Sequence, residues 1–239
     1  MSLSCELQLR RVSLTLLALS VLLCQVQGTM AKSDSQLVHC DRFGKDENSP
    51  LLILLHGVSG PAPFYSDQAK FFAAHGYRVV LPHYLDASHG QNATDKNYEA
   101  WVAAVSKVIA SESAQGKQPP ATFLVGYSLG ASIALALGSQ GEKVNAIAEL
   151  YGSLPDKYFR DMKTMPPLLI LHGSLDDQIP VDNATRLTQL CTDSGLRCDT
   201  HIYPSEGHGF APKTQEDADR RILDFFSQAP KPFQGAHSN

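Results

Sequence analysis

The sequence predicts an α/β protein with a mostly parallel sheet that carries helices on both faces. Short, uninterrupted apolar runs, typical of buried strands, alternate along the chain with longer segments of helical periodicity. Strands that alternate with helices imply right-handed crossovers and a parallel sheet. The 239 residues are 43% hydrophobic and 18% charged, which is enough apolar material for one sizeable core.

The first clear strand is the run Leu-Leu-Ile-Leu-Leu at 51–55. This run does not alternate with polar residues, so we expect it to be covered on both faces. Further strands are predicted at 77–81, 122–125, 144–150, 168–171 and 199–203, and helices at 65–74, 98–109, 129–137, 182–191 and 217–226. The connections leave no room for a second domain or a long lid.

The first 28 residues have the pattern of a secretory signal peptide. Arg10 and Arg11 precede an apolar run at 12–23, and Val26 and Gly28 occupy the two positions before the cleavage point that prefer small side chains. The run is shorter than the roughly 20 apolar residues that span a membrane. We expect cleavage after Gly28 and export to the periplasm or the medium. An uncleaved anchor and a translation start at Met30 are the alternatives.

Cleavage would leave one domain at 29–229 and a loose tail at 230–239. The mature chain would then have no stable membrane span. The formal net charge of −4 argues against a nucleic-acid partner, which usually requires a clustered basic excess. We expect a monomer.

Three cysteines would remain after cleavage: Cys40, Cys191 and Cys198. Export favours oxidation. A turn containing Gly195 separates the end of a predicted helix from the next strand, and it could bring the Cα atoms of Cys191 and Cys198 within the roughly 4.4–6.8 Å that a disulfide requires. We predict this disulfide and interpret Cys40 as a small buried hydrophobe or a free thiol. No Cys/His spacing resembles a zinc site, and we expect neither a metal nor a cofactor.

The strongest chemical motif is Gly-Tyr-Ser-Leu-Gly at 126–130, between a predicted strand and an apolar helix. In this context a G-x-S-x-G motif places the serine on a strained strand-to-helix turn, which exposes its hydroxyl above the sheet edge. Ser128 is therefore the candidate nucleophile. The alternative is a glycine-rich turn whose serine only caps the helix.

A serine nucleophile needs a base, and the base needs an acid to orient it. His208 lies in a glycine-bounded loop after the last strand and is the candidate base; a solvated loop histidine is the other interpretation. Asp176 and Asp177 both follow the strand before it. We favour Asp176, four residues before Pro180, as the acid, and interpret Asp177 as a solvated carboxylate.

Acyl transfer also requires hydrogen-bond donors for the oxyanion. We expect the backbone N–H of Leu129 to be one and that of Val58, in the loop at 56–60, to be the other. The glycines of that loop could simply shape a turn. His56 is interpreted as structural.

Taken together, the motifs at 51–57, 126–130, 173–176 and 207–210 resemble the dienelactone hydrolase family of the α/β-hydrolases. The resemblance implies the α/β-hydrolase fold with a minimal lid. The founding enzymes of the family use a cysteine nucleophile where this chain has Ser128. They also carry a glutamate near the loop that here reads His56-Gly57-Val58.

These departures favour a general carboxylic-ester hydrolase over an enzyme for dienelactone itself. We expect a serine hydrolase that acts on a small-molecule ester through an acyl-enzyme. Tyr127 and Phe210 are predicted to line the substrate site, although each could equally be core packing. The same triad could serve a peptidase or an acyltransferase, and a binding protein that retained the scaffold is the non-enzymatic alternative.

Overall fold

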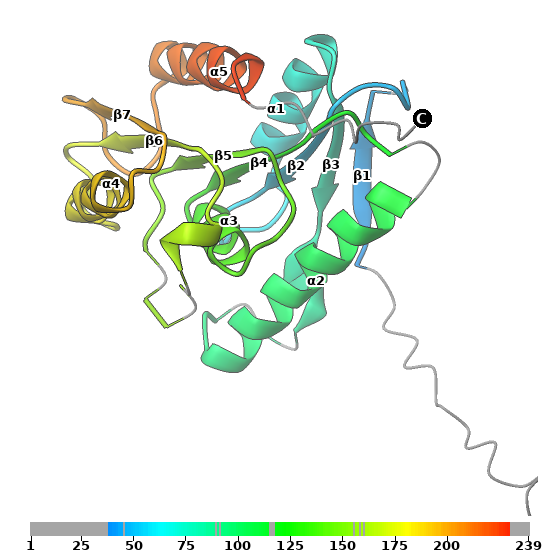
Figure 1. Ribbon diagram of the computed structural model, residues 1–239, viewed down its shortest axis with the longest axis horizontal. Helices are drawn as coiled ribbons and strands as arrows, with labels where there is room; N and C mark the ends of the chain where they lie inside the picture. Colours follow the sequence, from blue (N-terminus) through cyan, green and yellow to red (C-terminus); the bar gives the residue numbers. More distant parts are fainter. Residues whose placement is uncertain are drawn as a thin grey trace, which may run out of the picture. The chain divides into compact units, whose positions relative to one another are not determined.

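The computed structural model describes residues 38–229 except positions 45, 89, 91, 115–117, 155, 158 and 160. Its centre is a seven-stranded sheet in the order β1-β3-β2-β4-β5-β6-β7 (Figure 1). The strands are β1 (Cys40–Phe43), β2 (Leu51–Leu55), β3 (Arg78–Pro82), β4 (Thr122–Tyr127), β5 (Ala146–Leu150), β6 (Leu168–Gly173) and β7 (Cys198–Tyr203). Only β1 and β3 pair antiparallel among them. The predicted signal peptide and tail lie outside the described residues.

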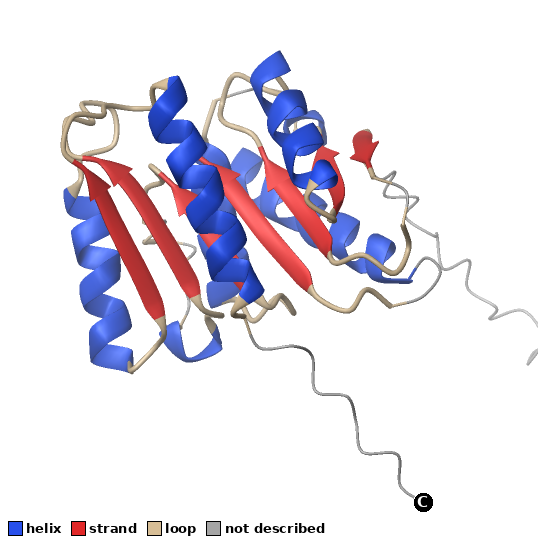
Figure 2. Cartoon of the chain, turned by 90° about the horizontal axis from the view of Figure 1, so that it is seen from above, coloured by secondary structure: helices blue, strands red, loops and turns tan. Residues whose placement is uncertain are grey.

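Helices cover both faces of the sheet, as predicted (Figure 2). They are α1 (Pro63–Ala74), α2 (Asp95–Ala114), α3 (Leu129–Ser139), α4 (Asp182–Ser194) and α5 (Pro212–Ser227), with the short 3₁₀ helices η1 (Tyr84–Ala87) and η2 (Met162–Thr164). Within the described part of the chain, no helix has the length and apolar character needed to cross a membrane.

Strand β2 explains why an unbroken apolar run suits this fold. Leu51, Ile53 and Leu55 belong to the core shared with α2, α3 and α4, whereas Leu52 and Leu54 belong to the core shared with α1 and α5. All five side chains are fully buried. Burying one such side chain stabilises the fold by about 1.5–3 kcal/mol, so both faces of this central strand contribute.

Strand β1, at the edge of the sheet, was not predicted from the sequence. Its four residues, Cys-Asp-Arg-Phe, are mostly half-buried and carry two charges. Edge strands are often short and charged because only one side is paired. The apolar pattern that identifies central strands is therefore absent here.

The predicted disulfide between Cys191 and Cys198 is present, with the Cα atoms 6.1 Å apart. It joins the last turn of α4 to the start of β7, and Gly195, at φ 63°, makes the turn between them. Cys40 is a free, half-buried cysteine.

Replacing Cys191 and Cys198 together by alanine should lower the free energy of unfolding by about 2–3 kcal/mol, because a cross-link over a short loop restricts the unfolded chain. Urea unfolding of the oxidised wild type and the double variant measures this loss. Cys40→Ala is the matched control. Equal midpoints for the double variant and the wild type would contradict the stabilising role.

Candidate active site

Ser128 sits on the sharp turn between β4 and α3, as the motif predicted. Its φ of 55° places a non-glycine residue in the left-handed region, a conformation that costs of the order of 1–3 kcal/mol and often marks a functional site. The flanking glycines allow the turn to close. A Cβ at Gly126 would lie 2.5 Å from the carbonyl oxygen of Gly130, and a Cβ at Gly130 would lie 2.6 Å from that of His56.

The structure brings the three predicted catalytic side chains into one hydrogen-bonded chain. Ser128 Oγ lies 2.9 Å from His208 Nε2, and His208 Nδ1 lies 2.9 Å from Asp176 Oδ2. The residues come from the segments that follow β4, β7 and β6, and the carboxyl ends of parallel strands meet at one edge of the sheet. This geometry lets Nδ1–H donate to the carboxylate while Nε2 accepts the serine proton.

Backbone amides hold the Asp176 carboxylate in place. Its side chain is fully buried, and Oδ1 accepts hydrogen bonds from the N–H groups of Gln178 at 3.0 Å and Ile179 at 2.8 Å. Oδ2 is thereby left for His208. Asp177 is exposed, so the structure distinguishes between the two aspartates that the sequence left open.

His172 is a second imidazole beside the same carboxylate, and the sequence analysis gave it no role. Its Nε2 lies 3.3 Å from Asp176 Oδ2 and 2.8 Å from the carbonyl oxygen of Ile179. The side chain is fully buried at the end of β6. His172 therefore fixes the loop that carries Asp176, and only its position directly before Gly173 could have signalled this.

The loop that carries His208 is packed closely on the end of β6. A Cβ at Gly173 would lie 2.5 Å from the carbonyl oxygen of Gly207, so glycine is required at the crossing. The imidazole contacts the ring of Tyr151 edge-on, with centroids 5.1 Å apart. Its side chain is 14% exposed, which leaves it accessible to a substrate without full solvation.

The two predicted oxyanion donors lie beside Ser128, the predicted nucleophile. Val58 and Leu129 line the same cavity as Ser128. Within the described residues, neither backbone N–H has a hydrogen-bond acceptor. The adjacent N–H of Gly57 donates to the hydroxyl of Tyr65 at 2.9 Å, which fixes the loop. Two unpaired amides beside a serine hydroxyl are suited to stabilise an oxyanion.

His56 supports this loop from within the core, as the sequence predicted. Its Nδ1 lies 2.7 Å from the carbonyl oxygen of Gly57, and its ring stacks on Tyr84 with centroids 4.3 Å apart. Burial lowers its pKa to about 4. The imidazole is therefore neutral at physiological pH and contributes no charge to the site.

The site opens into a cavity of about 350 Å³, within the size range of small-ligand pockets. Its walls are mainly apolar, with three serines and two charged residues among them. The lining residues are Val58, Ala93, Tyr98, Ser128, Leu129, Ser132, Ser153, Asp156, Lys157 and Ile179. A larger hollow of about 570 Å³ between α2 and the end of α3 contains none of the triad residues.

Neither aromatic residue predicted to bind substrate lines this cavity. The Tyr127 side chain is fully buried and its hydroxyl bonds to Gln68 at 3.1 Å. Successive side chains of a strand point to opposite faces, so the residue before Ser128 points into the core. Phe210 packs edge-on against Tyr151 and Tyr203, with centroids 5.0 and 4.9 Å away. The buried ring of Tyr127 cannot contact a substrate, which corrects that prediction. Phe210 is half-buried and lies outside the lining of the cavity.

Glu149, near the end of β5, is a buried acid close to the nucleophile turn. Its Oε2 accepts a hydrogen bond from the N–H of Gly152 at 3.0 Å. This bond fixes the turn at Tyr151, whose φ is 44°. Burial raises the pKa of Glu149 from its usual 4.5 to about 8. The carboxyl is therefore largely protonated at neutral pH.

Glu149→Gln should abolish part of the pH dependence of stability. The folded protein retains the Glu149 proton up to about pH 8, whereas the unfolded chain releases it near pH 4.5. The wild type should therefore lose stability relative to the glutamine variant as pH rises from 4.5 to 8. The relative loss should reach roughly 4–5 kcal/mol, at about 1.4 kcal/mol per pKa unit over the shift from 4.5 to about 8. Urea unfolding at both pH values tests this, and parallel profiles would contradict it.

Comparisons with known proteins agree with this architecture. The chain matches the dienelactone hydrolase family over residues 42–229. A protein of Methylorubrum extorquens named "Putative carboxymethylenebutenolidase" is 26% identical over 212 residues, which cover 75% of this chain and 72% of that protein.

Two solved structures illustrate the shared fold. The crystal structure of esterase PE8 superposes with a TM-score of 0.63 at 23% identity, over 77% of this chain and 97% of that one. The acylaminoacyl peptidase of Pyrococcus horikoshii gives a TM-score of 0.64 at 16% identity, over 83% of this chain and 40% of that one. This chain therefore has the α/β-hydrolase fold. Because the family match spans most of the chain and includes the segments that carry Ser128, Asp176 and His208, the protein belongs to the dienelactone hydrolase family.

Proposed function

We propose that the protein is a serine hydrolase that cleaves small carboxylic esters through an acyl-enzyme. The observation that carries this proposal is the hydrogen-bonded chain from Ser128 through His208 to Asp176, with both links at 2.9 Å. Its serine end lies in a cavity beside two unpaired backbone amides. Membership of the family supports hydrolysis as the reaction.

The first half of the reaction forms the acyl-enzyme. Ser128 Oγ attacks the ester carbonyl carbon while His208 Nε2 takes the hydroxyl proton. The carbonyl oxygen becomes an oxyanion that accepts hydrogen bonds from the N–H groups of Val58 and Leu129. As the C–O bond of the ester breaks, His208 gives its proton to the departing alkoxide, and the alcohol leaves.

The second half regenerates the enzyme. A water molecule gives a proton to His208 and its oxygen attacks the acyl carbon through a second oxyanion. The bond to Ser128 breaks, the proton returns to Ser128 Oγ, and the carboxylic acid departs. Asp176 remains ionised throughout and stabilises the imidazolium at each step.

A panel of p-nitrophenyl esters of increasing acyl length tests the proposed reaction. We expect the highest kcat/KM for short acyl groups, because the cavity of about 350 Å³ accommodates only a small substrate. The panel should also include an anilide of an N-acylated amino acid, which offers an amide bond in place of the ester bond. Cleavage of the anilide with no cleavage of any ester would favour a peptidase, and no turnover of either class would refute the proposal.

We further propose that the protein is exported. The disulfide between Cys191 and Cys198 is typical of an oxidising compartment, and the signal-like pattern at 1–28 points the same way. Fractionation of expressing cells, with determination of the mature N-terminus, tests this. Protein retained in the cytosol with an intact Met1 would contradict it.

A further inference from the structure

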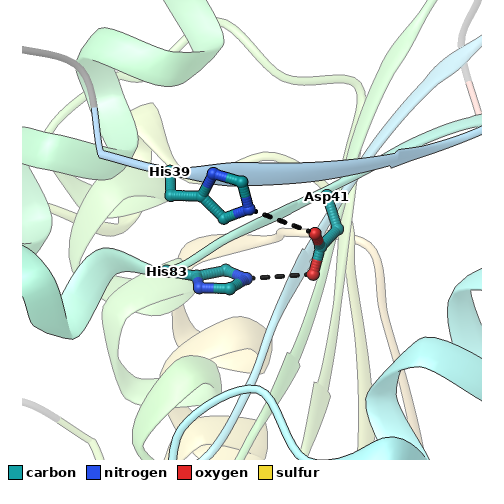
Figure 3. Close-up of side chains that lie close together, drawn as sticks. All are labelled: His39, Asp41 and His83. Atoms are coloured by element: carbon teal, nitrogen blue, oxygen red, sulfur yellow. Dashed lines mark hydrogen bonds and ion pairs between the residues drawn. The ribbon is translucent and has the colours of Figure 1, made fainter.

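Two histidines and an aspartate come together at the edge of the sheet, on β1 and after β3 (Figure 3). His39 directly precedes β1, Asp41 lies within it, and His83 directly follows β3. The antiparallel register pairs Cys40 with Pro82, so His39 and His83 lie opposite each other. The N–H of His83 donates to the carbonyl oxygen of His39 at 2.8 Å.

The side chains converge through the atoms that bind metals. Asp41 Oδ1 lies 3.3 Å from His39 Nε2, and Asp41 Oδ2 lies 2.9 Å from His83 Nε2. One potential ligand atom of each residue falls within 4.8 Å of the other two. Ligand atoms that share a tetrahedral zinc ion at about 2.0–2.1 Å lie about 3.4 Å apart. Each imidazole lies near this distance from a different carboxylate oxygen, so binding through a single oxygen of Asp41 requires a small rotation of the side chains.

The three groups have the freedom to complete such a site. The side chains of His39, Asp41 and His83 are 65%, 39% and 22% exposed, so an ion can reach them from solvent. Exposed imidazole–carboxylate pairs are individually weak, so little energy opposes a small rotation of His39.

We propose that His39, Asp41 and His83 form a binding site for a divalent transition-metal ion, with Zn²⁺ as the best match to its donors. Two imidazoles and a carboxylate are common zinc ligands, and three protein ligands leave a coordination position for water. The site is separate from the triad. It is independent of the proposed esterase function, because none of its residues lines the catalytic cavity.

A metal ion at this site would link one end of the edge strand β1 to the neighbouring segment that follows β3. Among the described strands, β1 pairs only with β3. Its other end is already held, because Glu112 accepts hydrogen bonds from Arg42 at 2.8 Å and from Arg78 at 2.9 Å. An ion bound by residues of both strands would provide the corresponding cross-link at the His39 end. Metal binding should therefore stabilise the folded protein.

Isothermal titration of the purified, chelator-treated protein with Zn²⁺ tests the proposal. We expect one ion per chain with a dissociation constant in the micromolar range or below, and a rise in melting temperature on addition of Zn²⁺. Asp41→Asn and His83→Gln should each weaken binding by at least tenfold. His75→Gln is the matched control, because His75 is an exposed histidine on the end of α1 and outside the cluster. It should bind like the wild type.

Direct structural evidence can separate this site from adventitious binding. In a crystal grown with Zn²⁺, anomalous scattering should place the ion within about 2.0–2.2 Å of one atom from each of the three residues. A melting curve in chelator checks that each variant is folded. The proposal fails if the wild type binds no Zn²⁺, if the Asp41 and His83 variants bind it as tightly as the wild type, or if the ion lies elsewhere.

Discussion

Replacing Ser128 by alanine should lower kcat for ester hydrolysis by about 10⁴- to 10⁶-fold. Its Oγ is the atom proposed to form the acyl bond, and it lies 2.9 Å from His208 Nε2. Without it, His208 and Asp176 have no nucleophile to activate. The residual rate should come from the oxyanion donors and substrate binding alone. Steady-state kinetics with a short p-nitrophenyl ester measure the loss.

Ser174→Ala is the matched control for this variant. Ser174 lies two residues before the acid, but its hydroxyl donates to the carbonyl oxygen of Pro204 at 2.7 Å and does not face the nucleophile. Its kcat should stay within a few-fold of the wild type. A folded Ser128→Ala protein that retains more than a tenth of wild-type turnover would show that another group attacks the ester.

Asp176→Asn should lower kcat by about 10⁴-fold, the scale seen when the acid of a serine protease triad becomes an amide. The backbone N–H groups of Gln178 and Ile179 both donate to Asp176 Oδ1. In the variant the amide oxygen should keep these two bonds, and the amide NH₂ would then face His208 Nδ1. The histidine would have to accept there and carry its proton on Nε2. In that tautomer it cannot take the proton of Ser128.

Asp177→Asn provides the control, because Asp177 is the neighbouring aspartate and its side chain is exposed. It should change kcat by no more than a few-fold. Equal losses in the two variants, or a loss confined to the Asp177 variant, would mean that the acid has been wrongly identified. Binding of substrate should be little affected in either case, so the change should appear in kcat more than in KM.

The sequence predicted the core of the fold because burial leaves a clear signal there. The run at 51–55 is uniformly apolar because its residues alternate between two buried faces. Strand β1 gives no such signal, since an edge strand pairs on one side only and tolerates charge.

The candidate site was predictable to the extent that local motifs define it. Glycine is required at positions 126 and 130 because other backbone atoms approach both positions closely. The G-x-S-x-G motif shows this requirement directly in the sequence. The role of His172, in contrast, depends on how the loop after it folds back against its side chain, and no local motif records that fold. Tyr127 was predicted to face the substrate, although strand alternation directs its ring into the core beside Gln68.

The proposed metal site shows the same limit. His39 and Asp41 are two residues apart, but His83 lies 42 residues after Asp41. Only the antiparallel register of β1 with β3 brings the three together. Spacing along the chain did not resemble a zinc motif, because the ligands come from two strands that are not consecutive in sequence.

The central claim is that the hydroxyl at position 128 is an activated nucleophile, and covalent labelling with a fluorophosphonate tests it most directly. Intact-mass analysis of the wild type should show one phosphonyl adduct, and peptide mapping should place it on Ser128. The Ser128→Ala protein should stay unlabelled under the same conditions. An unlabelled wild type, or equal labelling of both proteins, would contradict the account.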